Sequence, residues 1–170
     1  MTAADLLTAL RARGWSAGTA ESLTGGLVVA GLVAVPGASA SVRGGVVAYD
    51  TRVKRELLGV DGGLLDAHGP VHPEVACQMA YGVRTALAVD GSPCDVGLAT
   101  TGIAGPASPD GQPVGTVHIA VATPERTVTR HLRLGGDRDE IRRATVDAVI
   151  ALALDAVRGN IEAVNTVSPT

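Results

Sequence analysis

The sequence has 170 residues, of which 46% are hydrophobic and 18% charged, with a mean hydropathy of +0.27. These values suit one folded domain with a buried core and exclude a disordered chain. A formal net charge of −3 without a dense basic run argues against nucleic-acid binding. No apolar run reaches the roughly 18 residues of a membrane span, so we expect no membrane contact. Cys77 and Cys94, which lack metal-ligand spacing, indicate a reducing, cytoplasmic location.

The first half of the chain is predicted to alternate helices and strands: helix 3–13, strand 15–21, helix 27–35, strand 44–49 and a helix that begins after Asp50 or Thr51. Gly14 stands where a helix C-cap is expected. Residues 27–35 are apolar all round, which predicts a helix buried on most faces. The short apolar run 44–49 is typical of an interior strand.

The second half is predicted to hold a glycine-rich connection 59–69, helix 73–89, strand 95–103, loop 102–115, strands 116–123 and 126–134, and helix 137–158. A short turn at Pro124 and Glu125 makes the last two strands an antiparallel hairpin. Alternation followed by a hairpin predicts an α/β fold with three layers, in which helices cover both faces of a mixed sheet. We expect one domain over residues 1–159 and a C-terminal tail over 160–170, which lacks a clear pattern.

Ligands of such sheets bind at the carboxyl ends of the strands. Three segments follow apolar strands and are therefore expected to meet at one edge: residues 19–26, 49–54 and 100–106.

The first of these segments places Ser22 and Thr24 before two glycines and a helical run. Gly25 and Gly26 allow a tight turn and a close backbone approach to a ligand. The first N–H groups of the helix then favour an anion, so that Ser22 is well placed as a nucleophile. The alternative is that the hydroxyl groups only cap the helix.

The second segment carries Tyr49 at a strand end and Lys54 about one helical turn later. A lysine acts as a general base only when desolvation or a nearby cation lowers its pKa, and serine–lysine pairs use this device. The alternative is that Lys54 is a solvated helix lysine and Tyr49 a strand-end aromatic residue.

In the third segment, Thr100 and Thr101 precede Gly102, Gly105 and Pro106. These residues either present N–H and hydroxyl donors to a substrate or form a plain surface loop.

Arg138 follows at a predicted helix N-terminus. It either adds a guanidinium to a phosphate site or pairs with Asp137 or Glu140 on a solvated face. His68, His72, His118 and His131 form no metal motif, so we expect neither a metal nor a cofactor.

Taken together, these stretches resemble the CinA C-terminal domain family, the nicotinamide-nucleotide amidases also called NMN deamidases or PncC-like proteins. The resemblance spans about residues 5–158 in the family's order. The matching stretches are Thr19–Ser22 with Thr24–Gly26, Pro36–Ser39, Gly44–Tyr49 with Lys54, Leu57–Val60, His68–Gly69, Thr101–Pro106, Pro113–Val117 and Gly136–Arg138. The family's domain follows a molybdopterin-binding-like domain in longer relatives, and we expect this sequence to hold the C-terminal domain alone.

The resemblance implies hydrolysis of the carboxamide of nicotinamide mononucleotide in the pyridine-nucleotide cycle of NAD metabolism. It implies that Ser22 is the nucleophile, Lys54 the base and Tyr49 the tyrosine beside them. The remaining expected substrate-binding residues are Thr24, Gly25, Gly26, Thr101, Gly102, Gly105 and Arg138. The N–H groups of Thr24 to Gly26 are expected to form either an oxyanion hole or a phosphate cradle.

Some positions differ from the common family pattern. Leu23 stands where relatives often have cysteine, Pro70 and His72 replace small residues, and the loop 107–112 is shorter than in many relatives. The competing hypothesis is a non-catalytic CinA-like module that binds a nucleotide or a partner protein, in keeping with the competence and damage-inducible names of the family. An apolar, glycine-rich surface predicts a homo-oligomer, most simply a dimer.

Overall fold

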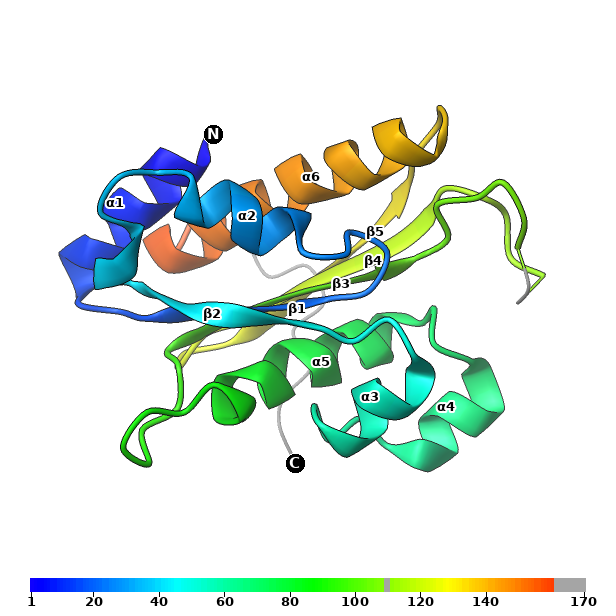
Figure 1. Cartoon of the computed structure of the whole chain (residues 1–170), viewed down its shortest axis with the longest axis horizontal. Helices are drawn as coiled ribbons and strands as arrows, with labels where there is room; N and C mark the ends of the chain where they lie inside the picture. The colour runs from blue at the N-terminus through cyan, green and yellow to red at the C-terminus, as the bar shows by residue number, and fades with distance from the viewer. Residues whose placement is uncertain (109–110, 161–170) are drawn as a thin grey trace.

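The computed structural model describes residues 1–108 and 111–160 and consists of a five-stranded sheet with helices on both faces (Figure 1). The elements are α1 (Ala3–Arg13), β1 (Ala17–Glu21), α2 (Leu27–Val33), η1 (Ala38–Ala40), β2 (Val42–Val47), α3 (Thr51–Glu56), α4 (Gly62–His68), α5 (Pro73–Ala86), β3 (Val96–Gly102), β4 (Thr116–Ala122), β5 (Thr127–Arg133) and α6 (Arg138–Arg158).

The strand order of the sheet is β2-β1-β3-β4-β5. β1 pairs in parallel with β2 and β3. β3 pairs antiparallel with β4, and β4 pairs antiparallel with β5. The predicted mixed sheet and the β4–β5 hairpin are therefore confirmed. The prediction that residues 44–49 form an interior strand is wrong, because β2 is an edge strand and Val47 is 48% exposed.

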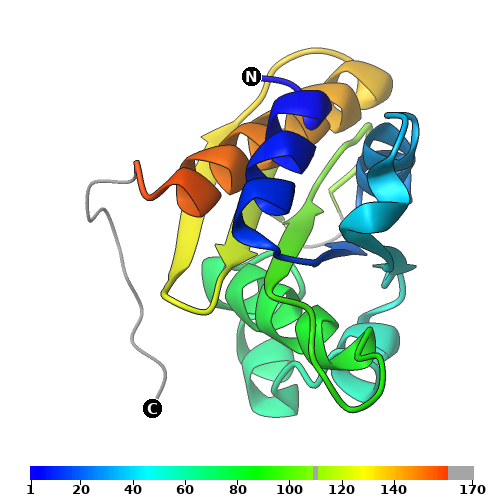
Figure 2. The same cartoon turned by 90° about the vertical axis from the view of Figure 1, so that its left-hand side faces the viewer.

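The helices form two layers around this sheet. Helices α1, α2 and α6 cover one face, and α3, α4 and α5 cover the other (Figures 1 and 2). The predicted three-layer α/β/α architecture is confirmed.

Local sequence signals fix where the longest helices begin and end. Asp137 accepts hydrogen bonds from the N–H groups of Asp139 and Glu140 and forms a capping box with Glu140 that starts α6. His72 caps α5, in which Pro73 takes the first position. Gly14 ends α1 in the left-handed conformation, as predicted.

Two helix predictions differ from the structure. Helix α2 buries only Val28 and Leu32, and Val33 is 57% exposed, so its outer side faces away from the core. The predicted connection 59–69 contains helix α4, which begins because the side chain of Asp61 accepts the N–H of Leu64. Gly62 and Gly63 are its first two residues and Gly69 follows its last, so these glycines do not interrupt the helix.

Small side chains let α5 lie close to the sheet. The core on that face includes Ala20, Ala99, Ala120 and Ala122. A Cβ on Gly97 would lie only 1.9 Å from the carbonyl oxygen of Ala80 in α5. The second core, between the sheet and α1, α2 and α6, consists mainly of Leu, Ile and Val.

In the part of the chain that the structure describes, no helix is long and apolar enough to cross a membrane. Residues 161–170 of the predicted tail, and residues 109–110 of the predicted loop, lie outside the described residues.

Candidate active site

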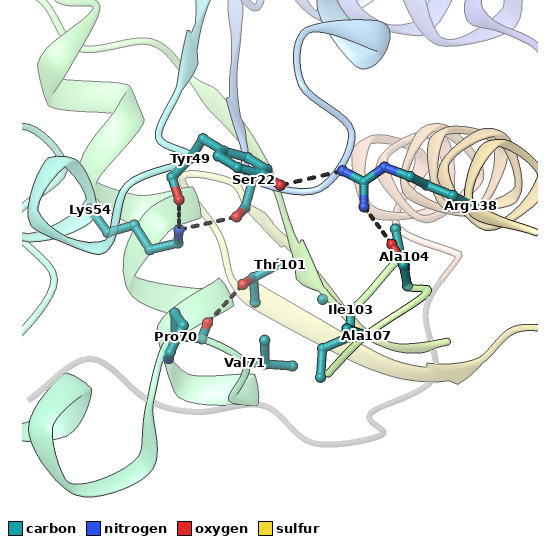
Figure 3. Close-up of a pocket in the computed structure, with 12 residues that line it drawn as sticks. Ser22, Tyr49, Lys54, Pro70, Val71, Thr101, Ile103, Ala104, Ala107 and Arg138 are labelled. Carbon is teal, nitrogen blue, oxygen red and sulfur yellow. Dashed lines mark hydrogen bonds between the residues drawn. The ribbon is translucent and has the colours of Figure 1, made fainter. Parts of the chain in front are cut away.

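The three segments that follow β1, β2 and β3 meet at one edge of the sheet, as predicted. They line a pocket together with a stretch between α4 and α5 and the start of α6 (Figure 3). The lining residues are Ser22, Tyr49, Lys54, Pro70, Val71, Thr101, Gly102, Ile103, Ala104, Gly105, Ala107 and Arg138.

Ser22 lies directly after β1 and is held at the sheet edge by its backbone. Its N–H donates to the carbonyl of Thr100, which continues the pairing of β1 with β3 beyond Glu21. The side chain does not cap α2, whose N-cap is Gly26. The capping alternative is therefore wrong. Ser22 is 8% exposed, and its hydroxyl faces the pocket.

Lys54 is the only lysine in the sequence, and it is almost completely buried, with 1% exposure. Asp50 starts α3 by accepting the N–H of Arg52, and this places Lys54 one turn into the helix and beneath the pocket. Its Nζ lies 3.0 Å from Oγ of Ser22 (Figure 3). The alternative of a solvated helix lysine is wrong.

The contacts of Lys54 suit an amine that exchanges a proton with Ser22. Nζ donates to the carbonyl of Ala48 at 2.7 Å and reaches that of Tyr49 at 3.4 Å. A neutral amine has two hydrogens and one lone pair, so these two carbonyls can take both hydrogens and leave the lone pair for the serine hydroxyl.

Tyr49 and Arg138 form the exposed rim of the pocket. Nη2 of Arg138 donates to the Tyr49 phenol at 3.3 Å, and Nη1 donates to the carbonyl of Gly105 at 2.7 Å (Figure 3). Arg138 pairs with neither Asp137 nor Glu140, because their side chains cap α6. The alternative of an ion pair with Asp137 or Glu140 is therefore wrong: among residues 1–108 and 111–160 Arg138 forms no such salt bridge. Its guanidinium faces the pocket.

The loop after β3 supplies one wall, to which Thr101, Gly102 and Gly105 belong. The Thr101 hydroxyl donates to the carbonyl of Pro70 at 2.7 Å and so joins this wall to the stretch that precedes α5. The alternative of a plain surface loop is wrong for Thr101, which is 1% exposed.

Three of the expected substrate-binding residues lie outside the pocket lining. The Thr24 hydroxyl is buried and lies 2.8 Å from that of Thr100. The N–H of Gly25 donates to the carbonyl of Ser22, and that of Gly26 donates to the carboxylate of Glu21. The predicted anion cradle at Gly25 and Gly26 is therefore wrong, because the protein's own groups already accept these hydrogens.

The carboxylate of Glu21 takes the place at the start of α2 that the sequence suggested for a ligand. It accepts the N–H groups of Gly26, Val28 and Val29 at 2.9, 3.0 and 2.8 Å. An anion at a helix N-terminus is favourable. The sequence signal for this role was a carboxylate at the end of an apolar strand, six residues before the first residue of α2.

Arg142 is a second site-forming residue whose role the sequence did not reveal. It lies one helical turn after Arg138, and its guanidinium donates to the carbonyls of Leu23 and Thr24 at 2.9 and 3.1 Å. The spacing of four residues between the two arginines was the available signal, since such residues share a helix face.

Within the described ranges, no group of three or more His, Cys, Asp or Glu side chains could hold a metal ion. His118 and His131 stack at 4.8 Å on neighbouring strands, and His68 stacks on His72 at the same distance. Burial, and then the proximity of His131 and His72, lower the pKa of His118 to about 4.

The sequence matches the model of the CinA C-terminal domain over residues 1–157. It is 52% identical to a CinA-like protein of Frankia casuarinae over 139 residues, which cover 82% of this chain and 30% of that protein. It is 45% identical to a putative competence-damage inducible protein of Caldanaerobacter subterraneus, over 90% of this chain and 35% of that protein. The chain thus spans about a third of the length of the curated relatives it matches.

Two crystal structures resemble the fold closely. A competence-damaged protein (CinA) superfamily protein from Klebsiella pneumoniae superposes with a TM-score of 0.86 and 31% identity, covering 92% of this chain and 96% of that one. The competence/damage inducible protein CihA from Agrobacterium tumefaciens gives a TM-score of 0.82 and 36% identity, with 92% and 93% coverage.

Proposed function

This chain belongs to the CinA C-terminal domain family, and we propose that it hydrolyses nicotinamide mononucleotide to nicotinate mononucleotide and ammonia. The observation that carries the proposal is the 3.0 Å approach of the buried Lys54 amine to the Ser22 hydroxyl inside a pocket. Ser–Lys pairs activate a serine without a histidine.

The first half of the proposed reaction forms an ester on Ser22. Oγ attacks the carboxamide carbon while Nζ of Lys54 takes the hydroxyl proton, which gives a tetrahedral intermediate. Lys54 then passes this proton to the amide nitrogen, the C–N bond breaks, and ammonia leaves.

The second half releases the acid. A water molecule attacks the ester carbon while Lys54 accepts one of its protons. The bond to Oγ breaks, Oγ takes the proton back from Lys54, and the carboxylic acid product leaves and ionises in solution. One amide and one water thus give one acid and one ammonia.

The rim of the pocket suits the nucleotide part of this substrate. The Arg138 guanidinium lies at the mouth of the pocket, and we assign to it the binding of the substrate phosphate. Thr101, Gly102 and Gly105 form the wall against which the pyridine ring or the ribose would lie. Tyr49, 62% exposed, extends the rim beside Arg138.

The test is ammonia release from nicotinamide mononucleotide by the purified protein and three variants. Ser22→Ala and Lys54→Met should each lower kcat by a factor of about 1,000 or more, as for other nucleophile and base deletions. Arg52→Ala is the matched control, because Arg52 is a basic residue of the same helix whose side chain is 82% exposed. Equal activity in all four proteins would reject the assignment.

The single lysine permits a direct test of the role of Lys54. Protein labelled with 13C at lysine Cε gives one lysine resonance, whose chemical shift reports the protonation of Nζ. The proposal requires a neutral amine at the pH where the protein is active. An amine that stays charged through that range contradicts a role as general base.

The relatives are named competence-damage inducible proteins, and this favours a second candidate. In this alternative the same pocket binds a nucleotide or partner without turning it over. Calorimetric binding of nicotinamide mononucleotide with no ammonia released by the unmodified protein would support it against the amidase.

A further inference from the structure

Arg142 fixes the backbone immediately after Ser22. Its Nε and Nη2 donate to the carbonyl oxygens of Leu23 and Thr24, and its side chain is 26% exposed. Two hydrogen bonds from one planar guanidinium set the direction of two consecutive peptide groups. A single surface ion pair with Asp139, at 3.9 Å, is its only salt bridge in the described part of the chain.

Glu21 holds the other end of the same turn. Its carboxylate accepts the N–H groups of Gly26, Val28 and Val29, and it is 1% exposed. The turn that carries Ser22 is thus held at both ends. The Glu21 carboxylate accepts the N–H groups at the start of α2, and the Arg142 guanidinium donates to two carbonyls that follow Ser22. Neither residue lines the pocket.

This arrangement fixes the backbone turn after Ser22. Ser22 is the first residue of a turn closed by the N–H of Gly25 on the Ser22 carbonyl. Arg142 therefore holds the last two peptide groups of this turn.

We propose that Arg142 is a positioning residue that fixes the backbone turn after Ser22 and thereby holds the Ser22 hydroxyl in the orientation from which it attacks a carbonyl. The inference rests on the proposed Ser22 nucleophile. A nucleophile that is held in its reactive geometry before the reaction does not have to be oriented as the transition state forms. Arg142 acts through the backbone and does not touch the substrate.

The first readout is steady-state hydrolysis of nicotinamide mononucleotide. Arg142→Ala should lower kcat by about 10- to 100-fold while KM changes by less than about twofold, because the orientation of Oγ matters for the chemical step and not for substrate binding. Arg143→Ala is the matched control: Arg143 is the next residue, is 75% exposed and pairs only with Asp139 among the described residues. A kcat for Arg142→Ala equal to that of Arg143→Ala overturns the proposal.

Chemical rescue separates positioning from a loss of folding. Millimolar guanidinium added to Arg142→Ala should restore part of kcat and leave Ser22→Ala inactive. Arg142→Lys, which can reach one carbonyl, should have an intermediate kcat. If Arg142→Ala does not fold, as judged by circular dichroism, Arg142→Lys should still fold and takes its place in the comparison. A kcat that follows the folded fraction alone, without rescue, contradicts the proposal.

A second probe does not depend on the assigned substrate. An alkyl fluorophosphonate reacts with Ser22 by forming an Oγ–P bond and expelling fluoride, with the hydroxyl proton passing to Lys54, and intact mass spectrometry follows the adduct. Slower labelling of Arg142→Ala than of Arg143→Ala supports the inference even if the wild type releases no ammonia, which would refute only the proposed substrate. Equal labelling rates refute the inference whatever the substrate is.

Discussion

Acid should destabilise this protein through His118. The residue is 7% exposed, and its Nδ1 has no hydrogen-bond partner in the described part of the chain. It pairs across the sheet with Thr101 of the pocket wall. Burial and then the neighbouring His131 and His72 lower its pKa from 6.5 to about 4.

The sign and size follow from proton linkage. Between these two pKa values the unfolded chain binds a proton at His118 that the folded protein does not, so stability falls as the pH falls. From pH 7 to pH 5 the imidazole becomes almost fully protonated in the unfolded chain but only about one-tenth protonated in the folded one. The loss is about 2 kcal/mol, which corresponds to a Tm about 4–8 °C lower for a domain of this size.

The assay is urea unfolding at pH 7 and pH 5 for the wild type, His118→Gln and His68→Gln. The wild type and His68→Gln, whose ring is exposed, should lose about 2 kcal/mol more than His118→Gln over this interval. The reasoning is refuted if all three proteins lose the same free energy of unfolding, because His118 would then titrate alike in the folded and unfolded states.

Three further predictions concern the backbone and the rim of the site. Glu21→Gln places an amide group against buried N–H donors and should cost about 1–3 kcal/mol in chemical denaturation; an unchanged midpoint would mean that the carboxylate does not hold the start of α2. Gly97→Ala should lower Tm, since its Cβ would lie 1.9 Å from the Ala80 carbonyl and overpacking costs about 1–3 kcal/mol; a wild-type Tm would contradict the close packing of α5. Tyr49→Phe removes the phenol that accepts from Arg138 and should lower kcat/KM for the nucleotide by about 2- to 10-fold, and an unaltered ratio would exclude a role for that contact.

Most of the secondary structure could be predicted from short-range signals. Gly14 and Asp137 mark helix ends because capping depends only on residues within one turn. Helix α4 was missed because its two glycines were read as a connection, although Asp61 caps it. The edge position of β2 was also missed, since an apolar run does not reveal whether a strand has one neighbour or two.

The site was predicted in part. Ser22, Tyr49 and Lys54 were found because they follow strands whose ends meet at one edge. Gly25 and Gly26 were assigned to a ligand because the sequence does not reveal that Glu21 fills the helix N-terminus. Arg142 belongs to the site through contacts with residues more than 100 positions away, which no local pattern records.

The sequence by itself determined most of the order of the elements, the mixed sheet and the edge at which the pocket lies, because hydrophobic periodicity, caps and turns act over a few residues. Only the tertiary structure decided which polar groups are engaged. It buried the single lysine against Ser22 and turned the Glu21 carboxylate onto α2. It also brought Arg138 and Arg142 of α6 into contact with two different loops, those after β3 and β1. The availability of a donor or a proton acceptor depends on what packs against it, and that packing comes from distant parts of the chain.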